Sequence, residues 1–266
     1  MNAAPHISFA VPAHDEEHYL PAALDAIHAS ARPLGVPYEI VVADDASTDR
    51  TAEVAREHGA KVVRVDRRQI AAARNAAARA SSGAIFIFVD ADTLLNPDAL
   101  QASLKVLESG AIGGGCLCRF DGKIPLYARC MINLIVPLFR LANLCGGSML
   151  FCTRSAYEAS GGWDEAFFAS EEIHFARTLK RLGRFSVARP LVTTSGRKFR
   201  THSGFEILGS LLRLAFAGPG GLRNRQRLAI WYGPRRADPH HAPADTPARR
   251  PEPSIRRAST CGWERG

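Results

Sequence analysis

The chain contains 266 residues, of which 46% are hydrophobic, and its formal net charge is +8. A chain of this length and composition can bury a full hydrophobic core, as one large or two small domains. The six cysteines show no paired spacings, which argues against a disulfide framework. The pair Cys116-x-Cys118 is too tight for a zinc knuckle and lacks a second pair. We therefore expect free thiols in a reducing compartment.

Targeting and membrane-spanning patterns are not apparent. The N-terminus lacks the basic stretch followed by an apolar one that marks a signal peptide, and no apolar run reaches the roughly 18 residues that span a bilayer. We therefore expect a cytoplasmic protein. The positive charge keeps nucleic acid, acidic lipid and anionic substrates open as partners, and residues 196–227 hold seven basic residues against one acid.

The first 110 residues alternate four times between strand and helix patterns. The predicted strands are Ile7–Val11, Tyr38–Ala43, Lys61–Val65 and Ile85–Val89. The first predicted helix ends near Ala29, and the second covers Asp49–His58 with Ser47 or Thr48 as its cap. The third covers Ile70–Ala80, and the fourth runs from Pro97 to about Glu108. This period predicts an α/β fold with a doubly wound, mostly parallel sheet. No strand precedes G-x-G-x-x-G or a phosphate loop, so carboxylates and metal would have to hold any nucleotide.

The alternation is less regular after residue 110. The patterns predict a strand over Ile112–Phe120, an apolar helix over Leu126–Leu144, a loop entering a short strand at 146–151, and a helix over Ser170–Leu182. The apolar helix suits either core packing or a face for lipid or acceptor. We expect a single domain over 1–233, with a nucleotide-binding half (1–110) and an acceptor half (111–233). Residues 234–266, rich in Pro and Arg, are expected to form a disordered tail.

Two carboxylates, Asp90 and Asp92, directly follow the most apolar predicted strand. Open α/β sheets bind their ligands at the carboxyl ends of strands, and residues i and i+2 share a side. Paired carboxylates are hard oxygen ligands for Mg²⁺ or Mn²⁺, which can hold a diphosphate at the same time. The alternative interpretation is a turn that caps the next helix.

Several stretches together resemble the family-2 glycosyltransferases of the GT-A fold. They are residues 12–17 (PAHDEE), 43–49 (ADDASTD), 73–77 (ARNAA) with 90–92 (DAD), and 161–164 (GGWD) with 170–172 (SEE). Their order and spacing match the family over roughly residues 7–190. Residues 195–199 (SGRKF) are similar to the C-terminal part of a soluble subgroup. The resemblance implies a GT-A fold with a Rossmann-like central sheet, a nucleotide-diphosphate sugar as donor, and single displacement with inversion.

The resemblance also implies roles for individual residues. Those expected to bind the nucleotide sugar are Pro12, Ala13, Glu16, Asp44, Asp45, Arg74, Asp90 and Gly147. Asp44 or Asp45 would accept from a uracil or guanine N–H, and Arg74 would face phosphate. Asp92, helped by Asp90, would ligate Mn²⁺ or Mg²⁺. Metal and arginine would neutralise the leaving group, where charge develops.

The acceptor hydroxyl needs a general base, which typically contributes about 10²–10⁴-fold. Glu172, with Glu171 beside it, stands where the family has its Glu-Asp pair. A carboxylate at a helix start has its charged form favoured by the helix dipole. Trp163 would either stack on a sugar ring or pack in its turn. His14 replaces the usual Asn of the family, so the base contacts there are open.

Three other functions are weighed against this one. A sugar-phosphate nucleotidyltransferase shares the fold but requires a Gly-rich, Arg-containing loop after the first strand, which residues 12–17 are not. A basic nucleic-acid- or membrane-binding module would leave the paired carboxylates unexplained. A catalytically degenerate relative would bind nucleotide without turnover. We expect a glycan, lipid or small-molecule acceptor, no nucleic-acid partner, and a peripheral contact of the 126–144 and 196–227 segments with the inner face of the membrane.

Overall fold

The structure, a computed structural model, describes residues 6–207, 209–210, 223, 225, 228, 232–233, 236 and 238. The strands are β1 (Ile7–Ala13), β2 (Tyr38–Asp45), β3 (Lys61–Val65), β4 (Ile85–Val89), β5 (Thr93–Leu94), β6 (Gly113–Phe120), β7 (Met149–Thr153) and β8 (Phe185–Thr194). The helices are α1 (Leu20–Ala31), the short 3₁₀ helix η1 (Arg32–Leu34), α2 (Thr51–Glu57), α3 (Ile70–Ala80), α4 (Pro97–Glu108), α5 (Leu126–Leu141), α6 (Arg154–Ser160), α7 (Glu171–Leu182) and α8 (Arg197–Thr201).

The strands form one sheet in the order β3-β2-β1-β4-β7-β6-β8-β5. The chain builds outward from β1 through β2 to β3 and then returns to place β4 on the other side of β1, all four parallel. This confirms the mostly parallel α/β sheet. β7 pairs antiparallel with both β4 and β6, and so joins the two predicted halves into one sheet. The strand order reverses between β1 and β4, where open α/β sheets bind ligands.

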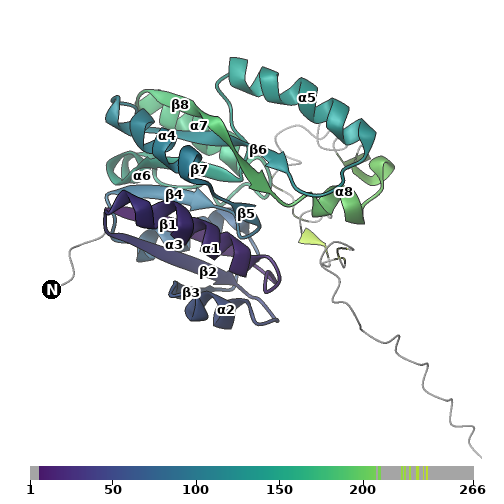
Figure 1. Cartoon of the computed structure of the whole chain (residues 1–266), viewed down its shortest axis with the longest axis horizontal. Helices are drawn as coiled ribbons and strands as arrows, with labels where there is room; N and C mark the ends of the chain where they lie inside the picture. The colour runs from purple at the N-terminus through teal and green to yellow at the C-terminus, as the bar shows by residue number, and fades with distance from the viewer. Residues whose placement is uncertain are drawn as a thin grey trace, which may run out of the picture.

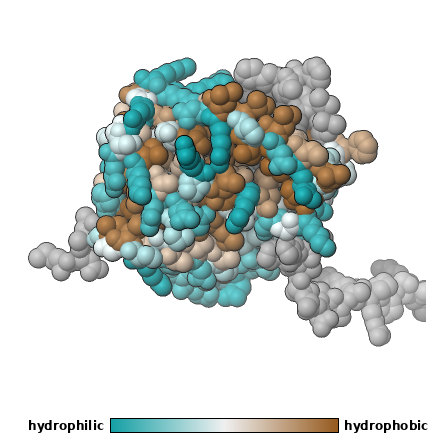
Figure 2. Space-filling view, turned by 45° about the horizontal axis from the view of Figure 1, so that its top comes forward, coloured by the Kyte–Doolittle hydropathy of each residue, from teal (hydrophilic) through white to brown (hydrophobic). Residues whose placement is uncertain are grey.

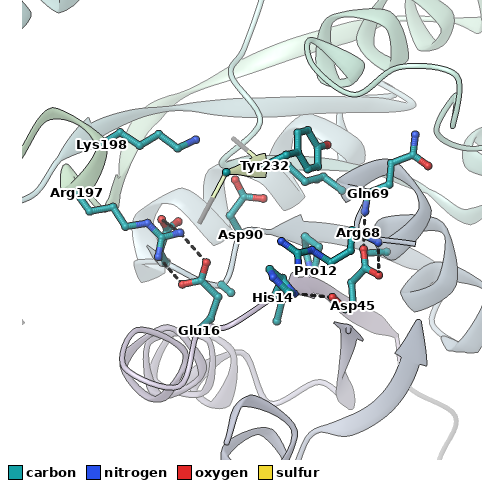
Figure 3. A pocket seen from close by; sticks show the side chains of 16 residues that line it. Pro12, His14, Glu16, Asp45, Arg68, Gln69, Asp90, Arg197, Lys198 and Tyr232 are labelled. Atoms are coloured by element: carbon teal, nitrogen blue, oxygen red, sulfur yellow. Dashed lines mark hydrogen bonds and ion pairs between the residues drawn. The ribbon is translucent and has the colours of Figure 1, made fainter. Parts of the chain in front are cut away.

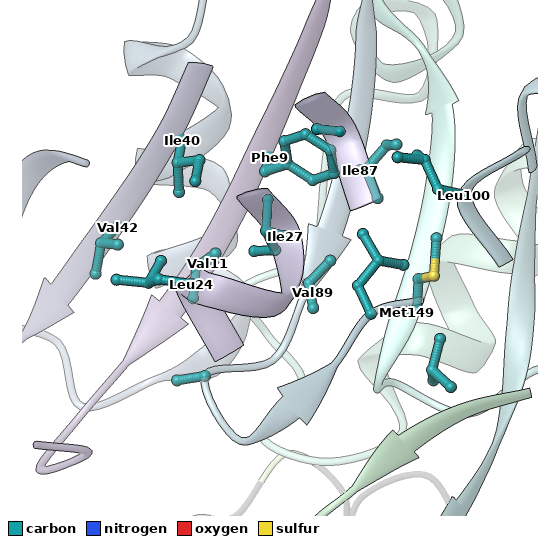
Figure 4. Close-up of a cluster of buried hydrophobic side chains, with 14 of the residues drawn as sticks. Phe9, Val11, Leu24, Ile27, Ile40, Val42, Ile87, Val89, Leu100 and Met149 are labelled. Carbon is teal, nitrogen blue, oxygen red and sulfur yellow. The ribbon is translucent and has the colours of Figure 1, made fainter. Parts of the chain in front are cut away.

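Alternating side chains of the central strands build a core on each face of the sheet. Phe9, Val11 and Ile87 point to the face covered by α1, α2 and α4 (Figures 1 and 4). Phe86 and Phe88 point to the opposite face, where they pack with side chains of α3, α6 and α7. The continuous apolar run in β4 is therefore explained by burial on both faces, as expected of a central parallel strand.

The cap predicted for the second helix is wrong. α2 begins at Thr51, and the carboxylate of Asp49 accepts its backbone N–H at 2.9 Å. Ser47 instead accepts the N–H of Asp15 at 3.0 Å, and the N–H of Thr48 donates to the carboxylate of Asp15 at 2.7 Å. Ser47 and Thr48 thus connect the loop after β2 to the loop after β1 by hydrogen bonds.

The second half of the chain contains more helices and strands than the sequence patterns predicted. The predicted apolar helix is found as α5, which lies along the edge of the molecule (Figure 1). The sequence patterns did not indicate α6 or β8. Most of 234–266 lies outside the described residues, but Asp238 is 7% exposed and pairs with Arg200 at 2.6 Å. The contacts of the domain thus extend at least to Asp238.

Candidate active site

A cleft opens at the carboxyl ends of β1, β2 and β4, at the point where the strand order reverses (Figure 3). It contains about 790 Å³ of space between protein atoms, part of which is open solvent. Pro12, Ala13 and Glu16 line it, as do Asp90 and Asp92. Asp45 lines it too, so six of the residues predicted from the motifs meet at one cavity.

The two aspartates at the end of β2 differ in position. Asp45 lines the cleft, but its carboxylate accepts the backbone N–H groups of Arg67, Arg68 and Gln69 at 2.6–2.8 Å. These bonds hold the loop before α3, including Arg68 in the left-handed region at φ 50°. Asp44 is buried, does not line the cleft, and accepts the N–H of Ser47 at 3.2 Å. Both aspartates therefore organise the loops around the cleft.

Arg74 is the centre of a buried network behind the cleft. One of its nitrogens donates to Asp90 at 2.8 Å and to the carbonyl of Gly147 at 2.9 Å, and the other donates to Glu171 at 3.0 Å. The side chain is 2% exposed and is not part of the cleft lining, although the motif predicted that it faces phosphate. Arg74 therefore neutralises Asp90 and Glu171 from behind the cleft.

Trp163 supports this arginine. Its ring lies 4.4 Å below the guanidinium of Arg74 and stacks on Phe175 with the ring centroids 4.3 Å apart. With 2% of its surface exposed, it cannot reach a sugar ring, and the packing alternative is correct. The indole and the carboxylates hold the guanidinium in one place by stacking and hydrogen bonding.

Glu171 and Glu172 open α7 beside this network. Glu171 is buried and ion-paired with Arg74. Glu172 lies beside Gly147, where a Cβ added to the glycine would come within 3.7 Å of the glutamate Cδ. Burial, followed by the charge of Glu171, raises the pKa of Glu172 to about 8. The helix-dipole expectation of a favoured charged form is therefore overridden, because burial and a like charge act more strongly here.

Asp92 is held by a second arginine, Arg197 at the start of α8. The carboxylate of Glu16 receives both terminal nitrogens of Arg197 at 2.6 Å, and one of these nitrogens is also 3.2 Å from Asp92 (Figure 3). Thr194 of β8 donates to the other oxygen of Asp92 at 3.3 Å. The guanidinium lies over the ring of Tyr19, 4.8 Å from its centroid.

Asp90 and Asp92 are the two carboxylates that the sequence predicts to hold a metal ion. Within the part of the chain that the structure describes, no group of three or more His, Cys, Asp and Glu side chains is arranged to hold a metal. Mg²⁺ is usually bound by one or two carboxylates together with substrate phosphates and water, so two carboxylates at one cleft fit such an ion. Each of the two is already paired with an arginine, Asp90 with Arg74 and Asp92 with Arg197, and burial raises the pKa of Asp90.

The cleft residues that were not predicted as site residues include Arg68, Gln69, Arg197 and Lys198. The first two lie in the loop between β3 and α3, which carries no motif. The other two belong to residues 195–199, whose likeness to a soluble subgroup was the available signal. His14 also lines the cleft, and its Nδ1 is 2.7 Å from the carbonyl oxygen of Asp45.

A second, mostly apolar cavity adjoins the cleft and shares Asp90, Asp92 and Lys198 with it. Its other walls include Phe120 of β6, Met131 of α5, Phe199 of α8 and Ile207. The paired aspartates thus lie between the cleft, on the side of β1 and β2, and a more apolar cavity on the side of α5.

The sequence model described as glycosyl transferase family 2 matches residues 8–156, more than half of the chain. The chain belongs to glycosyl transferase family 2. Among curated members, it is 31% identical over 143 residues to an undecaprenyl-phosphate 4-deoxy-4-formamido-L-arabinose transferase from Serratia proteamaculans. That match covers 49% of this chain and 43% of the relative, so the chain matches less than half of the relative's length.

Solved structures show that this family member has the GT-A fold. A mannosyltransferase from Pyrobaculum calidifontis in complex with GDP-Man and Mn²⁺ superposes with a TM-score of 0.59 at 22% identity, over 86% of this chain and 70% of the other. Glucosyl-3-phosphoglycerate synthase from Mycobacterium tuberculosis, in complex with Mn²⁺, UDP and glucosyl-3-phosphoglycerate, gives 0.54 at 21% identity, over 86% and 80%.

Proposed function

We propose that this protein is a metal-dependent inverting glycosyltransferase that moves a sugar from a UDP- or GDP-linked donor to a hydroxyl acceptor. The observation that carries the proposal is the position of Asp90 and Asp92. They line a cleft at the reversal of the sheet, and Arg74 connects Asp90 to Glu171 at the start of α7. The solved relatives with bound GDP-Man or UDP and Mn²⁺ support a nucleotide-sugar donor and a divalent ion.

Each residue has a distinct task in this reaction. Asp92, with Asp90, would hold Mn²⁺ or Mg²⁺, which when bound supplies positive charge for the departing diphosphate. Pro12 and Ala13 border the space for the nucleotide, and Gly147 borders the network that contains Glu172. Glu172, once deprotonated, accepts the proton of the acceptor hydroxyl. A single base without a protein nucleophile favours inversion at the anomeric carbon.

The acceptor is proposed to be lipid-linked. The cavity on the acceptor side of Asp92 is mostly apolar and reaches α5. On α5 itself, Leu126, Leu134, Leu138 and Leu141 are between 54% and 86% exposed. A curated relative is named for undecaprenyl phosphate, a lipid acceptor. An apolar cavity between the metal ligands and an exposed apolar helix suits an acceptor whose chain lies in a membrane.

The same helix suggests peripheral attachment to the inner face of a cytoplasmic membrane. α5 contains two charged residues, Arg129 and Arg140, and no acid. Figure 2 shows apolar surface on the side of the molecule that carries α5, among polar side chains. None of the described helices combines the length and apolarity needed to span a bilayer. A basic, apolar helix suits an interfacial position.

Part of the basic segment proposed for this contact is used elsewhere. Arg197 is committed to Glu16 and Asp92, and Arg200 is 10% exposed and paired with Asp121 and Asp238. The rest of this segment, beyond residue 210, lies largely outside the described residues. The membrane proposal therefore rests on α5 rather than on residues 196–227.

Isothermal titration with UDP and GDP, each with and without Mn²⁺, tests the donor site. We expect one nucleotide to bind in a Mn²⁺-dependent manner and Asp92→Asn to lose that dependence. Asp98→Asn, an exposed aspartate on α4, is the matched control and should bind like the wild type. Absence of binding under every condition would contradict the proposal and favour the binding module. Binding without turnover of any sugar donor would favour the degenerate relative.

Cosedimentation with vesicles tests the membrane face. Phosphatidylcholine vesicles containing phosphatidylglycerol should retain the protein at low salt, and Leu134→Ser with Leu138→Ser should release it. Leu182→Ser, on the exposed end of α7, is the control for added polarity and should still bind. No retention of the wild type at low salt would contradict the membrane proposal but leave the donor site untouched.

A further inference from the structure

Arg197 links two acids from distant parts of the chain. Glu16 lies in the loop after β1, Asp92 follows β4, and Arg197 stands 181 residues after Glu16. The same terminal nitrogen of Arg197 is 2.6 Å from Glu16 and 3.2 Å from Asp92. Glu16 is 5% and Asp92 15% exposed in their side chains. The two carboxylates therefore face each other across a single cationic nitrogen.

This arrangement conflicts with a metal at Asp92. A guanidinium cannot lose its charge in a protein, so a divalent ion on Asp92 would lie beside a fixed positive charge. Arg74 already faces Asp90 with a second positive charge. Both acids of the 90–92 pair are thus paired with arginines, and a metal ion has to compete with them.

A diphosphate provides the alternative partner. Guanidinium groups bind phosphate in a bidentate fashion, through the same pair of nitrogens that now hold Glu16. Arg197 and Lys198 both line the cleft, within the same cavity as Pro12 and Asp45 (Figure 3). α8 is short and directly follows β8, so the side chain can exchange partners without moving the sheet.

We propose that Arg197 is an exchangeable cation: it neutralises Glu16 and Asp92 in the free protein and transfers to the donor's diphosphate when the metal binds. Metal binding is then coupled to nucleotide binding, because only the diphosphate gives Arg197 a replacement for Asp92. The inference rests on the proposed donor site, and it adds a diphosphate-binding residue that also suppresses metal binding in the absence of donor.

The test compares Arg197→Gln with the wild type in two separate measurements. Binding of Mn²⁺ alone is followed by the electron paramagnetic resonance signal of the free ion. We expect Arg197→Gln to bind Mn²⁺ at least about tenfold more tightly, because the positive charge that Glu16 and Asp92 share is removed. Adding Asp92→Asn to Arg197→Gln should abolish this gain. For the nucleotide, isothermal titration with UDP and GDP in Mn²⁺ should show about 10–100-fold weaker binding.

The opposite changes in Mn²⁺ affinity and nucleotide affinity distinguish an exchange of partners by Arg197 from a purely structural role. A variant that is merely misfolded loses both metal and nucleotide binding, and its circular dichroism changes. Arg200→Gln, on the same helix but paired away from the cleft, controls for loss of a basic residue and should leave Mn²⁺ binding unchanged. An unchanged or weaker Mn²⁺ affinity in Arg197→Gln overturns the proposal. If Arg197→Gln gains Mn²⁺ affinity but the wild type binds neither nucleotide, the result supports suppression of metal binding by Arg197 and rejects the proposed function.

Discussion

At Glu172 the helix terminus and the burial of the side chain act in opposite directions. Burial and Glu171 raise the pKa of Glu172 to about 8, so the folded protein holds this proton at neutral pH. Only the deprotonated form can act as a base. We expect kcat/KM to rise with pH and level off above about pH 8, measured with saturating Mn²⁺ and a soluble acceptor.

The variant Glu172→Gln tests whether the rise of kcat/KM with pH comes from Glu172 or from another ionisable group. It should lower kcat by about 10²–10⁴-fold and remove the rise near pH 8. Since the raised pKa means that the folded state binds more protons than the unfolded state between about pH 4.5 and 8, wild-type stability falls over that range. Chemical denaturation should show a smaller fall for the variant. A wild-type profile flat from pH 6 to pH 9 would reject Glu172 as the base.

Among the described glycines, Gly114 of β6 leaves the least room for a side chain. A Cβ on Gly114 would lie 2.1 Å from the carbonyl oxygen of Ser186 and 2.5 Å from the ring of Phe151. We expect Gly114→Ala to destabilise the protein by about 1–3 kcal/mol or more, because the strand would have to shift. Urea denaturation measures the loss.

Gly146→Ala is the matched control for β6. Nothing lies within 4 Å of a Cβ at Gly146, so its stability should stay within about 0.5 kcal/mol of the wild type. Equal stability of the two variants would show that β6 accommodates a methyl group. It would also remove the packing reason for the run of three glycines at 113–115, which the sequence patterns did not connect to any function.

For the whole molecule, the two predicted halves share one sheet and one buried network. β4 pairs with β7, and Arg74 of the first half contacts Glu171 and Gly147 of the second. We therefore expect a single cooperative thermal transition. Far-ultraviolet circular dichroism and tryptophan fluorescence, to which buried Trp163 contributes, should give the same midpoint. Two separate midpoints would show that residues 1–110 and 111–233 unfold independently.

Local sequence determined most of the elements and the edge of the sheet where the motifs meet. The patterns placed β3, α3 and α4 at their observed bounds, because burial on one face imposes a period of two or 3.6 residues. The order of strand and helix predicted parallel pairing, and carboxyl ends of parallel strands share an edge. Pro12, Ala13, Asp90 and Asp92 were therefore foreseeable as neighbours from spacing and family resemblance.

The partners and charges of the site were decided by the tertiary structure alone. Arg74 meets Glu171 across 97 residues, and Arg197 meets Glu16 across 181, so neither pair has a local pattern. The raised pKa of Glu172 depends on burial that several elements produce together. Motifs record which functional groups a site contains. Which cation each carboxylate receives depends on packing between distant segments, which no periodicity encodes.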